Sequence, residues 1–326
     1  MHEGMKNKTV LVTGATGLIG QALVKRLLCL DTKVLAIVRN IDKAKKILGD
    51  DKRISYIVGD ITEIEIKSLD IDFIIHGASN TSSKAFVNNP VGVINTAIEG
   101  TKRTLEIASL SNVKGYVFLS SMEVYGVPTS DEKIEESQGT NLNTMVARSA
   151  YPESKRLCES LCTAYESQYK VPTKVVRLTQ TFGPGVQYND GRVFAEFARC
   201  VIEGRDIILH TKGETKRSYL YTEDAVDAIL TVLTNGTIGE AYNAANEDTY
   251  CSILDLAYLF AGKSADHPID IKFDIEQDLS HYGYAPVLRM NLSTEKLCNL
   301  GWRPCFQLPE MIDSLIEDMK KRIFLS

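Results

Sequence analysis

The protein has 326 residues, of which 44% are hydrophobic and 24% charged, and its formal net charge is −5. This composition is typical of a soluble globular chain with one large domain or with a large and a small one. The acidic balance disfavours nucleic acid as a partner. Seven cysteines without a CxxC pair predict free thiols in a reducing cytoplasm and no metal site. The first ten residues lack an apolar signal core, and no apolar run nears the ~18 residues of a membrane helix, so we expect neither secretion nor membrane insertion.

The run Thr9–Gly20 contains the first structural pattern of the chain. Its opening residues, TVLV, are rich in β-branched side chains and predict a buried strand. Gly14, Gly17 and Gly20 follow at GxxGxxG spacing, and Leu18–Leu30 has apolar residues at helical spacing. A glycine turn of this kind brings the backbone close to a pyrophosphate and directs the free N–H groups of the next helix at the anion. An ordinary strand-to-helix turn would contain the same glycines, so the assignment depends on the rest of the chain.

Strands and helices continue to alternate through the first half of the chain. The further predicted strands are Lys33–Val38, Ile54–Val58, Asp72–His76, Gly115–Leu119 and Thr173–Leu178. The predicted helices are Asp42–Leu48, Pro90–Leu110 and Tyr151–Tyr169, and a polar loop covers Val127–Ser149. This alternation predicts an α/β fold with a doubly wound parallel sheet, which binds ligands at the carboxyl ends of its strands.

The pattern becomes less regular after Thr181. The predicted elements there are helices at Val193–Glu203, Thr222–Thr234, Ser252–Gly262, Ser293–Leu300 and Leu308–Phe324, and short strands near Ile207–His210 and Arg217–Tyr221. We therefore expect a dinucleotide-binding domain over residues 1–180 and a smaller α/β substrate-binding region over residues 181–326. Some crossing of the chain between the two is part of this expectation.

Tyr151 and Lys155 are four residues apart at the start of a predicted helix, so they share one face of it. A lysine ammonium near a phenol lowers the phenol pKa from about 10, which would let Tyr151 accept a proton from a sugar hydroxyl near neutral pH. Ser121 ends the preceding strand at the same edge of the sheet, and its hydroxyl would bond the oxygen that Tyr151 deprotonates. The Tyr–Lys spacing also arises by chance, and a serine at a strand end also serves as a turn or capping residue.

Further motifs follow in order along the chain. They are Asp60-Ile61, His76-Gly77-Ala78-Ser79, Asn95 with Gly100-Thr101, Ser120-Ser121-x-x-Val124-Tyr125-Gly126, Tyr151-x3-Lys155, Arg177, Gly183-Pro184, Asp190-Gly191-Arg192-Val193, Arg217 and Arg289. Together with the glycine loop they resemble the extended short-chain dehydrogenase/reductase family, and within it the nucleotide-sugar epimerases, dehydratases and decarboxylases. The resemblance covers nearly the whole chain. It implies a Rossmann-like fold, an NAD(P) cofactor and a nucleotide-diphosphate sugar as substrate.

The resemblance also implies a reaction. Tyr151 takes the C4 hydroxyl proton while oxidised nicotinamide takes the C4 hydride, and the 4-ketone then leads to a 4-epimer, to a 4-keto-6-deoxy sugar by loss of water, or to a pentose by loss of a C6 carboxylate. We expect an epimerase or dehydratase type of enzyme that recycles its cofactor. The alternatives are a nucleotide-sugar decarboxylase, an NADPH-dependent keto-sugar reductase and a non-catalytic nucleotide-sensing protein. Relatives often form homodimers through the helices that match Pro90–Leu110 and Tyr151–Tyr169, and we expect the same here.

Individual site residues follow from the same resemblance. The implied catalytic residues are Tyr151, Lys155, Ser121 and Glu123. The implied cofactor-binding residues are Gly14, Thr16, Gly17, Leu18, Ile19, Gly20, Arg39, Asp60, Ile61, Gly77, Ala78, Ser79, Asn95, Tyr151 and Lys155. The implied substrate-binding residues are Lys84, Ser121, Gln180, Arg192, Arg217 and Arg289. For Lys84, exposure to solvent is an equally good interpretation.

The cofactor preference depends on a departure from the family pattern. Val38 stands where NAD-preferring relatives have a carboxylate that bonds both ribose hydroxyls, and valine cannot do this. The following Arg39 would pair with a 2′-phosphate, which favours NADP over NAD. In the alternative, Arg39 stacks on the adenine or faces solvent.

Two further departures concern the sugar. Glu123 occupies a position at which dehydratase and decarboxylase relatives carry a glutamate, where it would act as a base near C5 or C6. A surface or structural role is the alternative. Met122 stands where the dehydratases of glucose chemistry have a proton-donating aspartic acid, and methionine cannot donate that proton. Gln180 replaces an asparagine with the same donor and acceptor groups, which changes the pocket or reflects simple drift.

Overall fold

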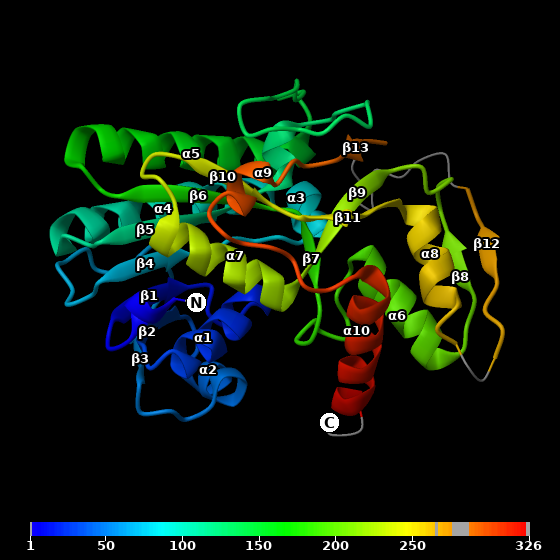
Figure 1. The fold of residues 1–326 in the computed structure, drawn as a ribbon, viewed down its shortest axis with the longest axis horizontal. Helices are drawn as coiled ribbons and strands as arrows, with labels where there is room; N and C mark the ends of the chain where they lie inside the picture. Colours follow the sequence, from blue (N-terminus) through cyan, green and yellow to red (C-terminus); the bar gives the residue numbers. More distant parts are fainter. Residues whose placement is uncertain (1, 265–266, 276–286, 324–326) are drawn as a thin grey trace.

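The computed structural model describes residues 2–264, 267–275 and 287–323 (Figure 1). Within these residues, seven strands form one parallel sheet in the order β10-β6-β5-β4-β1-β2-β3. The strands are β1 (Thr9–Thr13), β2 (Lys33–Val38), β3 (Ile54–Val58), β4 (Phe73–His76), β5 (Gly115–Ser121), β6 (Thr173–Leu178) and β10 (Ala241–Ala244). The helices that cover the sheet are α1 (Leu18–Cys29), α2 (Ile41–Leu48), α4 (Pro90–Ser111), α5 (Ala150–Tyr169) and α7 (Thr222–Asn235). The predicted doubly wound parallel sheet is confirmed.

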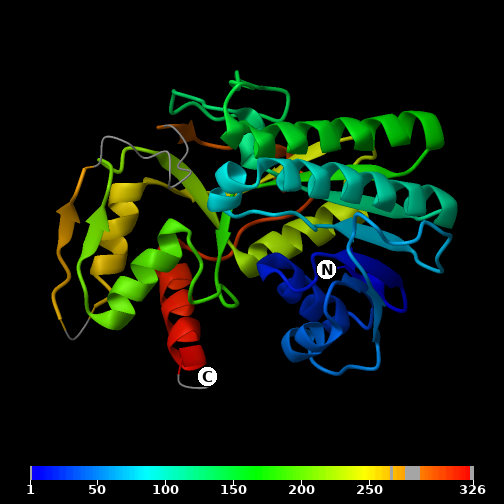
Figure 2. The same ribbon diagram turned by 180° about the vertical axis from the view of Figure 1, so that it is seen from behind.

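Each face of the sheet has its own hydrophobic core, because successive residues of a strand point to opposite sides. In β1, Val10 and Val12 pack with α1 and α7 on one face. Leu11 packs in the other core with α4 and α5, which run side by side over the opposite face (Figure 2). The helices cover the two faces and leave the carboxyl ends of the strands open, which is where sheets of this kind bind ligands.

A second region is built on a small sheet and its own core. In this sheet β11 (Asn246–Ser252), β9 (Lys216–Tyr221) and β13 (Arg289–Met290) are neighbours, and β7 (Gln180–Phe182) also pairs with β9. The other elements of the region are α6 (Val193–Glu203), α8 (Ile253–Ala261), α10 (Leu308–Ile323) and the strand pair β8 (Ile207–Leu209) and β12 (Ile271–Phe273). The core between these helices combines aliphatic residues with aromatic ones such as Phe182, Phe194 and Phe260. This region stands to one side of the large sheet (Figure 2).

The chain crosses between the two regions. After β9, α7 returns to the large sheet, and β10 adds its seventh strand beside β6. The short helix α9 (Glu295–Cys298) packs beside β10. The domain boundary at residue 180 stays a prediction. Two segments that follow this residue, α7 and β10, belong to the large sheet or pack on it.

Several short elements differ from the sequence prediction. The structure adds α3 (Ser83–Asn88), β7, β10, β11, β12 and β13, none of which was predicted, and two 3-10 helices at the site, η2 (Met122–Tyr125) and η3 (Ala147–Ser149). The helix predicted at Ser293–Leu300 is wrong in length, because Thr294 is its N-cap and the chain tightens into i to i+3 bonds at Leu300 and Gly301. Phe324, the predicted last residue of the final helix, lies outside the described residues.

A screen of the described helices for long apolar stretches finds none that could cross a membrane.

Candidate active site

The glycine loop after β1 forms a backbone cradle that side chains would fill. Gly14 has φ +70°, and a Cβ there would lie 2.7 Å from the carbonyl oxygen of Gly77. A Cβ at Gly20 would lie 2.1 Å from the oxygen of Gly14. Gly17 is the N-cap of α1 and provides no side-chain cap, so the first-turn N–H groups at Leu18 and Ile19 are available to an anion. These features fit the diphosphate of a dinucleotide.

The turn after β4 lies against this cradle and is fixed by Thr13 and His76. The N–H groups of Gly77 and Ala78 both donate to Thr13 Oγ1, at 3.1 and 3.0 Å. The Oγ atom of Ser79 is buried and has no hydrogen-bond partner among the described residues, so it is a candidate contact for the cofactor.

The end of β2 forms the wall of a separate cavity of about 230 Å³. Its lining residues are Thr16, Val38, Arg39, Asn40 and Lys43. Thr16 comes from the glycine loop, so the cavity adjoins the cradle. Two cationic side chains, Arg39 and Lys43, line this cavity. Sequence reasoning identified Arg39 and missed Lys43.

Asp60 and Ile61 follow β3. Asp60 accepts hydrogen bonds from the backbone and the hydroxyl of Thr62, which hold the pKa of its carboxyl below the usual range. Ile61 is buried, and it packs against Gly100 of α4, where a Cβ would lie 3.2 Å from its side chain. The Asn95 side chain lies on the exposed face of α4. The contacts of these three residues with a cofactor stay predictions.

Tyr151 lies in the first turn of α5 and is only 5% exposed. Its ring stacks on Phe86 of α3, with ring centroids 4.3 Å apart and an interplanar angle of 11°. Its hydroxyl lies near enough to that of Ser121 to lower the pKa of the phenol, and Ser121 Oγ accepts the N–H of Glu123 at 3.2 Å. The structure thus brings Ser121 to Tyr151, and the same hydroxyl caps η2. Phe86 carries no motif, and α3 is too short to give a periodic pattern.

Lys155 is buried one turn after Tyr151 on the same helix face, as its spacing predicts. Its Nζ donates to the carbonyl oxygen of Leu119 at 2.7 Å and lies 5.9 Å from the centroid of the Tyr151 ring. Burial lowers the pKa of Lys155 to about 8. The ammonium is therefore directed at the end of β5 and not at the phenol.

The pKa of Tyr151 is raised above its usual value, whereas the sequence predicted a lowered one. Burial is the main cause, and the carboxylate of Glu123 adds to it, while the Ser121 hydroxyl and the guanidinium groups of Arg192 and Arg148 act in the opposite direction. The prediction considered only Lys155. It missed that the phenol is buried and that a carboxylate lies near it.

Glu123 makes an ion pair with Arg148, with Oε1 3.0 Å from Nη2. Sequence reasoning missed Arg148. The available signal was its position three residues before Tyr151, which is about one helical turn. Met122, next to Glu123, is buried and receives a hydrogen bond from Thr179 on its sulfur. A thioether at this place supplies no acid.

The predicted substrate residues lie in different settings. Arg217 donates to Gln180 Oε1 at 3.4 Å, and its Nε is buried without a partner among the described residues. Arg192 pairs with Asp190 at 2.6 Å, and it is near enough to Tyr151 to lower the pKa of the phenol.

Arg289 and Lys84 lie on other elements than Gln180 and Arg217. Arg289 is paired in register with Lys216, and both side chains contact Asp131. Arg289 therefore shares the sheet face of Lys216. Lys216 and Arg217 are neighbours on β9 and point to opposite faces, so Arg289 lies on the face opposite that of Arg217. Lys84 is exposed on α3. Contacts of these two residues with a substrate stay predictions.

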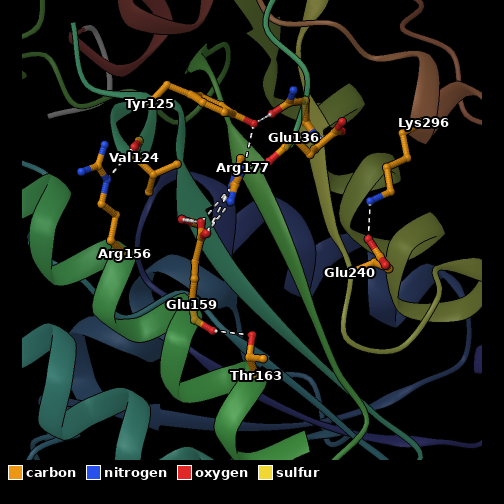
Figure 3. Close-up of polar contacts among 11 residues, drawn as sticks. Val124, Tyr125, Glu136, Arg156, Glu159, Thr163, Arg177, Glu240 and Lys296 are labelled. Carbon is orange, nitrogen blue, oxygen red and sulfur yellow. Dashed lines mark hydrogen bonds and ion pairs between the residues drawn. The ribbon is translucent and has the colours of Figure 1, made fainter. Parts of the chain in front are cut away.

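Between β6 and α5, a partly buried polar network holds the loop that leads to Tyr151. Arg177 forms an ion pair with Glu159 at 2.7 Å and donates to the hydroxyl of Tyr125 and the backbone oxygen of Glu136, both at 2.8 Å (Figure 3). Ser120, the neighbour of Ser121, donates to Glu159 at 2.5 Å. Arg177 is one of the motifs on which the resemblance rests, and its guanidinium is engaged in this network. It lines a separate polar cavity of about 500 Å³ beside α5.

Comparison with known proteins gives consistent results. The family model "NAD dependent epimerase/dehydratase family" matches residues 10–245. UDP-glucuronic acid decarboxylase 1 of Xenopus tropicalis is 28% identical over 97% of this chain and 73% of its own length. The structure of UDP-N-acetylglucosamine 4-epimerase from Methanobrevibacter ruminantium M1 superposes with a TM-score of 0.84, at 22% identity over 99% of this chain and all of the other.

Another similar structure is UDP-glucuronic acid 4-epimerase from Bacillus cereus in complex with UDP-glucuronic acid and NAD. It superposes with a TM-score of 0.82, at 20% identity over 96% of this chain and 99% of the other. At these identities the two structural matches show a shared fold. The family model spans the cofactor cradle, Ser121, Tyr151 and Lys155, so the chain belongs to the NAD-dependent epimerase/dehydratase family of enzymes.

Proposed function

We propose that the protein acts on a nucleotide-diphosphate sugar through a 4-keto intermediate and returns its cofactor to the starting oxidation state. The observation that carries this proposal is the contact between Ser121 and Tyr151 at the carboxyl end of β5, with Lys155 buried one turn away. When bound, the nicotinamide cofactor supplies reversible hydride transfer at C4. Tyr151 takes and returns the C4 hydroxyl proton, and Ser121 orients that oxygen.

The residues around Tyr151 bear on what becomes of the 4-ketone. Elimination of water needs an acid for the leaving hydroxyl, and buried Met122 provides none. Epimerisation at C4 needs only rotation of the ketone and return of the hydride.

Decarboxylation is a second candidate. A C6 carboxylate is β to a C4 ketone, so loss of CO₂ leaves an electron pair that the ketone delocalises as an enolate. Protonation at C5 then gives a 4-keto pentose, and return of the hydride to C4 completes the pentose. Two observations favour it, namely the Glu123–Arg148 pair beside Tyr151 and the similarity over 97% of the chain to a protein named a UDP-glucuronic acid decarboxylase.

The test is the mass of the product. UDP-glucuronic acid, UDP-glucose and UDP-N-acetylglucosamine are each incubated with the cofactor-loaded protein, with Tyr151→Phe as the control. Loss of CO₂, loss of water and an unchanged mass separate decarboxylation, dehydration and epimerisation. Consumption of NADPH in proportion to product would instead identify a reductase. Full turnover by Tyr151→Phe would refute the role of the phenol.

We also infer a preference for NADP over NAD. Arg39 and Lys43 line the cavity of about 230 Å³ at the end of β2, and Val38 contributes no carboxylate for the ribose hydroxyls. The expected result is tighter binding of NADP by the wild type, and loss of this difference in Arg39→Ala. Tighter binding of NAD by the wild type would contradict the inference.

The oligomeric state and location are proposed on weaker support. Exposed Val91 and Leu110 on α4 and Leu157 and Tyr169 on α5 are suited to a homodimer interface, and a monomeric mass by light scattering would contradict it. The seven free cysteines are compatible with a reducing cytoplasm, and recovery of the protein in a secreted fraction would contradict that location.

A further inference from the structure

The ion pair between Glu123 and Arg148 lies where three elements meet at Tyr151. Arg148 is in η3, directly before α5, and its guanidinium carbon is 5.8 Å from the ring centroid of Phe86. Phe86, on α3, stacks on the Tyr151 ring. Arg148, Phe86 and Tyr151 therefore form one packed group, and Glu123 joins it from η2.

Only one of the two carboxylate oxygens of Glu123 has a partner among the described residues. Arg148 contacts Oε1 at 3.0 Å, and the two side chains are only 17% and 21% exposed, so solvent screens the pair less than a surface pair. The Oε2 atom is buried without a hydrogen-bond partner among the described residues. The contact with Arg148 therefore provides the main electrostatic compensation seen for this carboxylate.

We propose that Arg148 is a positioning residue of the active site, which holds the carboxylate of Glu123 beside Tyr151 and offsets its negative charge there. The role of the phenol as a base rests on the proposed function. The contact between Arg148 and Glu123 and their nearness to Tyr151 do not.

Among the described residues, charged groups from four elements face Tyr151. Glu123 on η2 raises the pKa of the phenol, while Arg148 on η3 and Arg192 at the start of α6 lower it. Lys155 on α5 lies 5.9 Å from the ring centroid. Since Arg192 is already paired with Asp190, removal of Arg148 leaves Glu123 largely uncompensated at the phenol.

The pH profile of kcat/KM tests this arrangement. Turnover requires the phenolate, so the rising limb of the profile follows the pKa of Tyr151. Arg148→Gln removes a cation, and the limb should move to higher pH by roughly one unit, with about tenfold lower kcat/KM below the limb. Arg148→Lys keeps the charge and should stay close to wild type. Glu123→Gln should move the limb to lower pH.

A double variant and a matched control separate this effect from general damage. Arg148→Gln combined with Glu123→Gln removes the pair together, so its limb should return toward the wild-type position. The control is Arg26→Gln, because Arg26 pairs with Asp227 at 2.7 Å and neither residue is among the groups that act on Tyr151. It should leave the limb unchanged.

A direct titration distinguishes failure of this proposal from failure of the proposed function. Tyrosinate absorbance of the cofactor-loaded protein is recorded against pH, and subtraction of the Tyr151→Phe curve isolates one phenol among the 14 tyrosines. A higher midpoint in Arg148→Gln and a lower one in Glu123→Gln support the proposal even if no sugar is turned over. An unchanged midpoint in either folded variant overturns the proposed role of Arg148. If the midpoints shift but the wild type turns over no sugar, only the proposed function is refuted.

Discussion

Thr13, at the carboxyl end of β1, determines the protonation of His76. Its Oγ1 accepts the N–H groups of Gly77 and Ala78, so its single proton is left for Nδ1 of His76, 2.7 Å away. His76 then carries its own proton on Nε2 and donates it to Thr101 of α4 at 3.1 Å. Burial lowers the pKa of His76 to about 3, which keeps the ring neutral. A neutral histidine thus connects the turn next to the glycine cradle with α4.

This arrangement predicts an acid-sensitive fold. The unfolded chain binds a proton at His76 near pH 6.5, but the folded chain does so only near pH 3, so the stability that His76 contributes is lost as pH falls through that window. Between pH 7.5 and pH 5, His76 should lower the free energy of unfolding by about 2 kcal/mol. Urea titrations of wild type and His76→Gln at both pH values measure this.

The control for that experiment is His210→Gln, which changes a partly exposed histidine of the second region. It should lose as much stability on acidification as the wild type, whereas His76→Gln should lose less. If His76→Gln and the wild type showed the same loss, the neutral-histidine assignment would be wrong.

At the scale of elements, the turn from β1 into α1 depends on the absence of a side chain at Gly20. A Cβ there would lie 2.1 Å from the backbone oxygen of Gly14 and 2.7 Å from Cα of Ala15. Both are backbone atoms, so the clash can be relieved only if the loop or the helix shifts. Gly20→Ala should therefore cost about 1–3 kcal/mol of stability and weaken cofactor binding. Thermal unfolding and cofactor titration measure the two effects.

Gly191→Ala is the matched control, because a Cβ at Gly191 meets nothing within 4 Å. Equal stability and cofactor affinity of the two variants would contradict the close approach of α1 to the loop.

Short elements were missed because their sequences carry little local signal. The residues of β10 read AYNA, and a polar Asn243 in a four-residue run does not predict a buried strand. In the structure Asn243 is fully buried, because its side chain accepts from the hydroxyl of Tyr125 at 2.6 Å and donates to the carbonyl oxygens of Ile134 and Ser293. Distant partners satisfy the polar group, and no sequence window contains them.

At the scale of the whole molecule, Asp224 connects the two regions. It lies on α7, against the large sheet, and its carboxylate accepts the N–H groups of Cys305 and Phe306 at 3.0 and 3.2 Å. Its backbone oxygen accepts the indole N–H of Trp302 at 3.1 Å. This segment leads into α10, which packs in the core of the second region.

Asp224→Ala should lower the free energy of unfolding by about 2 kcal/mol or more, since it removes the acceptor of two backbone donors. Asp227→Ala is the control, because Asp227 makes an exposed ion pair with Arg26 that contributes at most about 1 kcal/mol. Chemical unfolding of both variants provides the comparison. A smaller loss in Asp224→Ala than in Asp227→Ala would show that the segment is held in another way.

From the sequence alone, the alternating strands and helices, the glycine turn and the shared helix face of Tyr151 and Lys155 could be predicted. Each of these depends on spacing within one or two elements, where hydrophobic period and helix geometry act locally. The parallel sheet followed from that alternation, and six of its seven strands were predicted. The motif order along the chain then indicated the family.

Only the tertiary structure decided the surroundings of Tyr151. The stack on Phe86, the ion pair of Arg148 with Glu123 and the raised pKa of the phenol depend on α3, η2 and η3 meeting at the start of α5. The direction of Lys155 toward Leu119 likewise depends on how α5 packs on β5. Burial and charge at one atom are sums over groups far apart in the chain, so local patterns identify the reacting residues but do not set their chemistry.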